Sequence, residues 1–143
     1  MTPSDLFVSP YTKLGGLVWV PRMLRKIRLH EQGRLPADYL PYLGLGFDRR
    51  CVRFLHVEYD ALVARVRTGG TDEEILAWCF ATGRQPSDVE ILVWNEYMIK
   101  RGWRDTDAPV DALQQYKEAY GLGHRADILT YFDFYEVDEG RKP

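Results

Sequence analysis

The sequence predicts an all-α fold, a single compact domain of six to eight short helices, and three observations lead to this prediction. Helix-capping signals recur along the chain, apolar residues follow them at spacings of three and four, and no region shows the sustained alternation of a half-buried strand. The 143 residues, 45% hydrophobic and 28% charged, are typical of one globular domain that folds without disulfides. We expect this domain to span residues 1–143, with residues 138–143 as a flexible tail.

The first long helix is expected from about Leu17 to Gln32, with Gly33 just past its end. Pro21 lies inside this stretch, where a proline removes a backbone hydrogen bond and clashes with the preceding turn. Two alternatives follow: either the helix begins near Val20, with Pro21 in its first turn, or it is kinked at Pro21.

The segment from Leu35 to Phe47 is expected to be a loop, because its prolines and glycines break any regular element. After it, Asp48 is expected to cap a helix through Arg49–Leu55, since aspartate is a preferred N-cap residue. By the same reasoning Asp60 caps a short helix that Gly69-Gly70 closes.

Two successive helices then begin with capping boxes. Thr71 is followed by Glu74, and Ser87 by Glu90, so each hydroxyl and each carboxylate can bond a free backbone N–H. Each helix is expected to end at a glycine in the left-handed conformation, Gly83 or Gly102. Two further helices are expected after Pro109 and around residues 128–135, where apolar and aromatic residues recur at helical spacing.

Composition excludes several classes of protein. No stretch approaches the roughly 18 apolar residues that cross a bilayer, and the first residues lack the layout of a signal peptide. Two cysteines without an export signal indicate free thiols in a reducing compartment, so we expect a soluble cytoplasmic protein with no membrane partner. The pI of about 5.9 argues against a nucleic-acid partner, since such domains are usually basic.

Charge is unevenly distributed along the chain. Residues 1–70 hold 11 basic and 6 acidic side chains, whereas residues 71–143 hold 8 and 15. This asymmetry has two interpretations: an anion-binding face in the first half, or ion pairs formed as the basic half packs against the acidic half.

Several stretches of the sequence carry a family resemblance. They are Ser9–Val18, Pro21–Met23, Lys26–Arg28, Phe47–Leu55, Thr71–Trp78 and Trp94–Glu96. Together they resemble a family of small bacterial proteins known only as a domain of unknown function. The resemblance covers most of the chain and implies a single intracellular domain. It implies no activity, cofactor or catalytic residue.

Cys51 is the candidate nucleophile. Three arginines flank it, Arg49, Arg50 and Arg53, and it would lie about three residues inside the helix that Asp48 caps. Both features favour a thiolate and lower the thiol pKa, and His30 or His56 could accept the proton. The alternative is that Cys51 is a small core residue, as most free cysteines are.

A ligand site is expected within residues 9–56, where basic, glycine and aromatic residues crowd together. Guanidinium groups on the first helix suit carboxylate or phosphate, and aromatic rings suit the body of a small ligand. The candidate ligand-binding residues are Tyr11, Trp19, Arg22, Lys26, Asp48, Arg49, Arg53 and His56. No metal or cofactor is expected, because His30, His56 and His124 are far apart in sequence and form no known ligand motif.

Two functions therefore remain open. One is a cytoplasmic protein that binds a small anionic ligand, or a small enzyme acting on one, with its site in residues 9–56. The other is a non-catalytic protein–protein interaction or regulatory module, including one that self-associates as a homo-oligomer and binds more weakly as salt rises.

Overall fold

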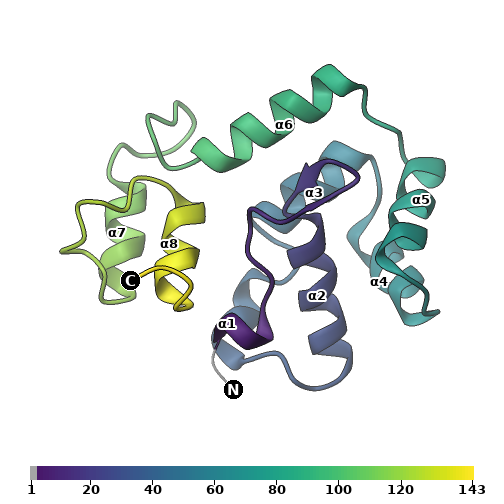
Figure 1. Cartoon of the computed structure of the whole chain (residues 1–143), viewed down its shortest axis with the longest axis horizontal. Coiled ribbons are helices and arrows are strands. Elements are labelled where there is room, and N and C mark those ends of the chain that lie inside the picture. The colour runs from purple at the N-terminus through teal and green to yellow at the C-terminus, as the bar shows by residue number, and fades with distance from the viewer. Residues whose placement is uncertain (1–2) are drawn as a thin grey trace.

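The computed structural model describes residues 3–143, and it confirms a mostly helical fold (Figure 1). Within these residues the helices are α1 (Pro3–Leu6), α2 (Val20–Glu31), α3 (Phe47–Leu55), α4 (Tyr59–Arg67), α5 (Asp72–Thr82), α6 (Asp88–Lys100), α7 (Ala112–Ala119) and α8 (Tyr131–Asp138). A short 3-10 helix, η1 (Ala37–Tyr42), and a two-stranded hairpin, β1 (Lys13–Leu14) and β2 (Leu17–Val18), complete the fold. No helix of this described part is both long and apolar enough to cross a membrane.

The start of α2 settles the question raised by Pro21. The helix begins at Val20 and holds Pro21 in its first turn, where the missing N–H has no intrahelical partner to lose. Leu17, expected in the helix, instead belongs to the antiparallel hairpin, which turns at Gly15-Gly16 with both φ angles positive. Trp19, with φ of 75°, separates the hairpin from the helix.

Both capping boxes form as expected. The hydroxyls of Thr71 and Ser87 accept hydrogen bonds from the backbone N–H groups of Glu74 and Glu90, and both glutamates bond back. Each pair supplies partners for backbone groups that a helix leaves free at its start. These two helix starts are therefore determined by local sequence.

Gly83 ends α5 for a different reason from the one expected. Its φ is −100°, which is not left-handed. A Cβ atom at Gly83 would lie 1.9 Å from the carbonyl oxygen of Leu55, and that oxygen also accepts the N–H of Arg84 at 3.0 Å. A glycine is required because the ends of α3 and α5 approach closely, whereas Gly102 does have a positive φ, 103°.

Neither expected aspartate cap is present. Both α3 and α4 begin one residue before the aspartate, and no side chain caps either helix. Asp48 is instead fully buried, with partners from other elements that no local pattern reveals. The segment between α2 and α3, expected to lack regular structure, contains η1.

The helices pack around one core with α2 near its centre. Figure 1 shows α4 and α5 on one side of α2, α7 and α8 on the other, and α6 spanning the top of both groups. The face of α2 that enters the core carries Val20, Met23, Leu24 and Ile27, and Phe132 of α8 joins the same cluster. The last helix therefore packs against the first half of the chain.

Residues 138–143, expected to form a flexible tail, make specific contacts with the rest of the chain. Glu139 is only 1% exposed and pairs with Arg22 of α2. Arg141 donates a hydrogen bond to the carbonyl oxygen of Phe7 at 3.0 Å and forms an ion pair with Glu136 at 3.1 Å. The C-terminal segment thus joins the N-terminal segment to α8.

Candidate functional site

A cavity of about 250 Å³ lies where η1 and the first turn of α3 meet α7 and α8. We call it the aromatic pocket, because six of its lining side chains are aromatic. Its lining consists of Trp19, Tyr42, Leu45, Gly46, Phe47, Arg50, Arg101, Tyr116, Tyr131 and Tyr135. The chain builds it from both halves, so it exists only in the folded protein.

The rings of the pocket hold one another in place. Phe47 lies 4.9 Å from Trp19 and 5.9 Å from Tyr131, measured between ring centroids. Tyr116 meets Tyr131 edge to face at 5.5 Å. Aromatic contacts at these separations are favourable, so the walls are fixed before any ligand arrives.

Burial keeps three tyrosines of the pocket in their neutral form near pH 7. It raises the pKa of Tyr135 to about 12 and also raises the pKa of Tyr116 and Tyr131. At the edge of the pocket, the hydroxyl groups of Tyr42 and Tyr120 are 2.9 Å apart and hydrogen-bonded. The phenols can therefore donate hydrogen bonds, while the charge of the pocket comes from its arginines.

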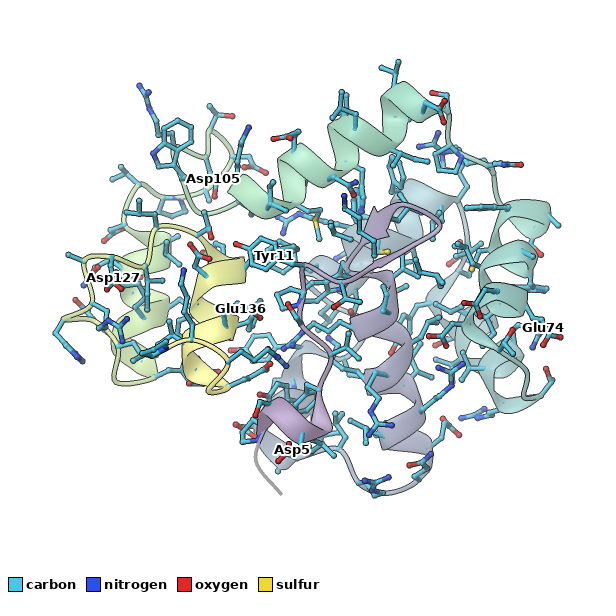
Figure 2. All side chains as sticks on the ribbon, in the orientation of Figure 1. Asp5, Tyr11, Glu74, Asp105, Asp127 and Glu136 are labelled. Carbon is cyan, nitrogen blue, oxygen red and sulfur yellow. The ribbon has the colours of Figure 1, made fainter. Side chains whose placement is uncertain are left out.

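Arg50 is the cation of the pocket that forms no salt bridge among the described residues, although its charge helps to lower the pKa of Asp107 from a longer distance. Within residues 3–143, no carboxylate oxygen lies within 4.0 Å of its guanidinium, whose Cζ is 5.7 Å from the centroid of the Phe47 ring. Arg101, the other arginine of the lining, is held by Asp105 at 3.4 Å and by Asp107. Asp105 is marked in Figure 2, just beyond the end of α6. Arg50 is thus the side chain whose charge remains available to an anion.

Asp48 forms the floor beneath Trp19. Its Oδ1 accepts the Trp19 indole N–H at 2.9 Å, and its Oδ2 lies 2.8 Å from Lys26 Nζ and accepts the backbone N–H of Gly44 at 3.1 Å. Burial lowers the pKa of Lys26, and the Asp48 carboxylate opposes that shift. A buried carboxylate with three partners is a structural group, since its lone pairs are already used.

A second buried ion pair lies beside the pocket. Arg22 donates two parallel hydrogen bonds to Glu139, at 2.8 and 2.7 Å, and Glu139 also accepts the Tyr39 hydroxyl at 2.8 Å. Burial opposes both charges, but their mutual contact raises the pKa of Arg22 and lowers that of Glu139. Arg22 Nε has no partner among the described residues, and Arg22 borders a cavity of about 30 Å³, enough for one water.

The structure brings together four of the candidate ligand-binding residues, Trp19, Arg22, Lys26 and Asp48. Trp19 lines the aromatic pocket, while the other three lie beneath or beside it. The two cations are nearly fully buried and paired with Asp48 and Glu139. The structure therefore places both cations in ion pairs with carboxylates, one from each half of the chain.

The other candidates are dispersed. Tyr11 points toward α8 in Figure 2 and donates its hydroxyl to Asp133 at 2.8 Å. Arg49 and His56 are exposed on α3 and at its end, and Arg53 borders a shallow groove between α3 and α6. His30 lines a separate cavity of about 200 Å³ beside Tyr59. No group of three potential metal ligands occurs in the part of the chain that the structure describes.

The surroundings of Cys51 favour the second interpretation, a small core residue, over a thiolate nucleophile. Cys51 is only 1% exposed, and burial together with the Asp48 carboxylate raises its thiol pKa well above the ordinary value. None of the three arginines is among the groups that shift the Cys51 pKa: Arg49 and Arg53 are exposed, and Arg50 lines the aromatic pocket. Cys51 packs instead in the core cluster.

Sequence reasoning missed the half of the pocket that α7 and α8 supply. Tyr116 and Tyr120 are four residues apart, as are Tyr131 and Tyr135, so each pair lies on one helix face. That repeated spacing of tyrosines was the available signal. A tyrosine hydroxyl needs a hydrogen-bond partner, which an apolar core rarely provides. Two helix faces that each carry a pair of tyrosines therefore indicate a site that water or a polar ligand can reach.

Comparison with protein families gives one match. A family model described as "Domain of unknown function (DUF5069)" matches residues 4–141, nearly the whole chain. No curated protein matches the sequence.

Proposed function

We propose that this protein, which belongs to the family DUF5069, a domain of unknown function, binds a small anion with a planar apolar body in its aromatic pocket. The observation that carries this proposal is the Arg50 guanidinium, a cation without a carboxylate partner among the described residues, on the wall of an aromatic cavity. A guanidinium binds carboxylate or phosphate through paired N–H groups, which gives such a site both affinity and orientation.

The shape of the pocket supports a planar ligand. Its walls are rings from Trp19, Phe47 and Tyr131, which favour stacked or edge-on contact with another ring. Its volume of about 250 Å³ lies just below the range typical of drug-sized ligands, so a single ring with one acidic group fits it best. The tyrosine hydroxyls add neutral hydrogen-bond donors for a second polar group.

The proposal is a binding protein in the cytoplasm. The idea of a small enzyme stays a prediction, and Cys51, its expected nucleophile, is not among the residues that line the aromatic pocket. The idea of an interaction module also stays a prediction, and a different surface bears on it, the outer face of α6.

The test uses single-ring carboxylates and their neutral amides as matched probes. Saturation-transfer NMR with benzoate and 4-hydroxybenzoate measures weak binding directly. We expect the acids to bind and the amides to bind much more weakly, because only the acids present an anion to Arg50.

Two variants separate the pocket from general surface charge. Arg50→Gln removes the proposed anion partner, whereas Arg53→Gln removes an equally basic, exposed residue one turn further along α3. We expect Arg50→Gln to lose the acid signal and Arg53→Gln to keep it. Binding that is equal in both variants, or no binding by any of the acids, would overturn the proposal.

A further inference from the structure

The outer face of α6 carries a continuous apolar stripe. Val89, Leu92 and Val93 are 69%, 60% and 60% exposed, and their spacing places them on one side of the helix. Tyr97 and Trp103 continue the stripe toward the C-terminal end and are also exposed. Figure 1 shows α6 along the upper edge of the molecule, with no other described element covering that side. Exposed apolar side chains that gather in this way mark an interaction surface, whereas isolated ones do not.

The stripe borders a groove of about 870 Å³. The groove runs from Leu92 along α6 to the loop that follows it, and Trp103 and Arg104 line its far end. The Arg104 guanidinium lies 5.4 Å from the centroid of the Trp103 ring, so the two side chains project together. One side of the groove is therefore formed by Leu92 and Val93 of α6, and the Trp103 ring projects at its far end.

Charge along this face changes sign from one end to the other. Asp88 precedes the stripe, Glu96 lies on it, and the cations Lys100 and Arg104 follow. Neither Asp88 nor Arg104 has an oppositely charged group within 4.0 Å among residues 3–143. Nearby Asp105 and Asp107 both contact Arg101, and neither lies within 4.0 Å of Arg104.

Two copies of this face bring opposite charges together in only one of two orientations. In a parallel pair, Asp88 would face Asp88 and Arg104 would face Arg104, which is repulsive. In an antiparallel pair related by a two-fold axis near Tyr97, Asp88 of each copy faces Arg104 of the other. The same arrangement places Trp103 of each copy against the apolar stripe of the other, beside the Asp88–Arg104 pair and near Val89.

We propose that the α6 face binds a second copy of this chain, forming an antiparallel, two-fold symmetric dimer. The apolar stripe supplies the buried surface, Trp103 packs on the partner's stripe, and the Asp88–Arg104 pairs select the orientation. The interface does not include Arg50, but its groove shares Arg101 with the lining of the aromatic pocket.

Sedimentation velocity of the full chain over a range of concentrations tests the dimer. We expect the wild-type protein to dimerise and Val93→Glu to be a monomer. Val110→Glu is the matched control, because Val110 is fully exposed but lies in the segment before α7, away from the stripe. A wild-type protein that stays monomeric at every concentration, or equal loss of dimer in both variants, overturns the proposal.

Charge reversal tests the orientation. Asp88→Lys makes both ends of the face basic, and Arg104→Asp makes both ends acidic. Each variant alone should dimerise about tenfold more weakly, since two attractive pairs per dimer become repulsive. An equimolar mixture should recover the wild-type affinity, because the lysine introduced in one chain then faces the aspartate introduced in the other, and the native Asp88 and Arg104 still face each other. In a parallel pair each single variant would dimerise as well as the wild-type protein, so that result, or a mixture as weak as its components, contradicts the antiparallel arrangement if both variants keep wild-type circular dichroism.

Discussion

Removing the carboxylate of Glu139 should destabilise the protein far more than removing an exposed carboxylate. Glu139→Gln keeps the shape of the side chain but leaves Arg22, which is 1% exposed, without its counter-charge. Arg141, whose Nη1 lies 2.8 Å from Glu139, loses the same partner. Two guanidinium groups would then be held together with no anion between them.

The expected loss follows from the geometry of the pair. Breaking a buried ion pair by removing one partner costs about 3–5 kcal/mol, because the remaining charge stays desolvated. A domain of this size has a total stability of about 5–15 kcal/mol, so the loss is a large fraction of it. The corresponding fall in Tm is about 10–20 °C.

Urea unfolding followed by circular dichroism gives the free energy of unfolding directly. Asp127→Asn is the matched control, since Asp127, labelled in Figure 2, also pairs with an arginine, but its side chain is 63% exposed. We expect the control to cost no more than about 1 kcal/mol. The double variant Arg22→Met, Glu139→Leu should be more stable than Glu139→Gln, because it leaves no unpaired charge at this pair. If Glu139→Gln cost no more than Asp127→Asn, the buried pair would not be what anchors the C-terminal segment.

Three further predictions concern other parts of the chain. The pKa of Glu139 is lowered in the folded state, so the unfolded chain binds the proton more readily. The stability that this group contributes is therefore present above about pH 4.5 and is lost as the pH falls through the lowered pKa. Glu139→Gln should flatten that part of an acid-unfolding curve. Cys51 should react with iodoacetamide far more slowly in the native protein than in urea up to about pH 8.5, the ordinary thiol pKa, and rapid native reaction detected by peptide mass spectrometry would contradict its burial. Gly83→Ala should lower the free energy of unfolding by about 3 kcal/mol, because its Cβ would overlap the Leu55 carbonyl oxygen. Gly121→Ala, at a residue with φ of 78° and open space around it, should lower it by only about 1 kcal/mol, and equal losses in thermal unfolding would contradict the close approach at Gly83.

The helices that begin with a local signal could be predicted from sequence, and those that begin with a tertiary contact could not. Thr71 and Ser87 lie three residues from the glutamates that complete their caps, so all the information is within one turn. Aspartate is also a preferred N-cap residue, but Asp48 instead pairs with Lys26, which lies 22 residues earlier, on α2. A buried ion pair can override a capping preference, and a single sequence does not reveal the pair.

Only the wall of the aromatic pocket that comes from the first half of the chain lies where the sequence placed a ligand site. Trp19 and the first turn of α3 fall within residues 9–56, where the ligand site was expected. The other wall comes from Tyr116, Tyr131 and Tyr135, which join the first wall only after α7 and α8 fold back on α2. The basic residues of α2 gave a misleading signal, because Arg22 pairs with Glu139 across 117 positions of the chain.

The most direct test of the aromatic pocket is to follow the tryptophan indole N–H signals by ¹H–¹⁵N NMR during titration with a single-ring carboxylate. The Trp19 indole lies in the wall of the pocket and donates to Asp48, whereas Trp103 is exposed on the α6 face. We expect the Trp19 signal to shift in a saturable way and the Trp103 signal to stay in place, with no Trp19 shift in Arg50→Gln. A shift of Trp103 alone, or saturation at Trp19 that persists without Arg50, would contradict the assignment of the aromatic pocket as an anion site.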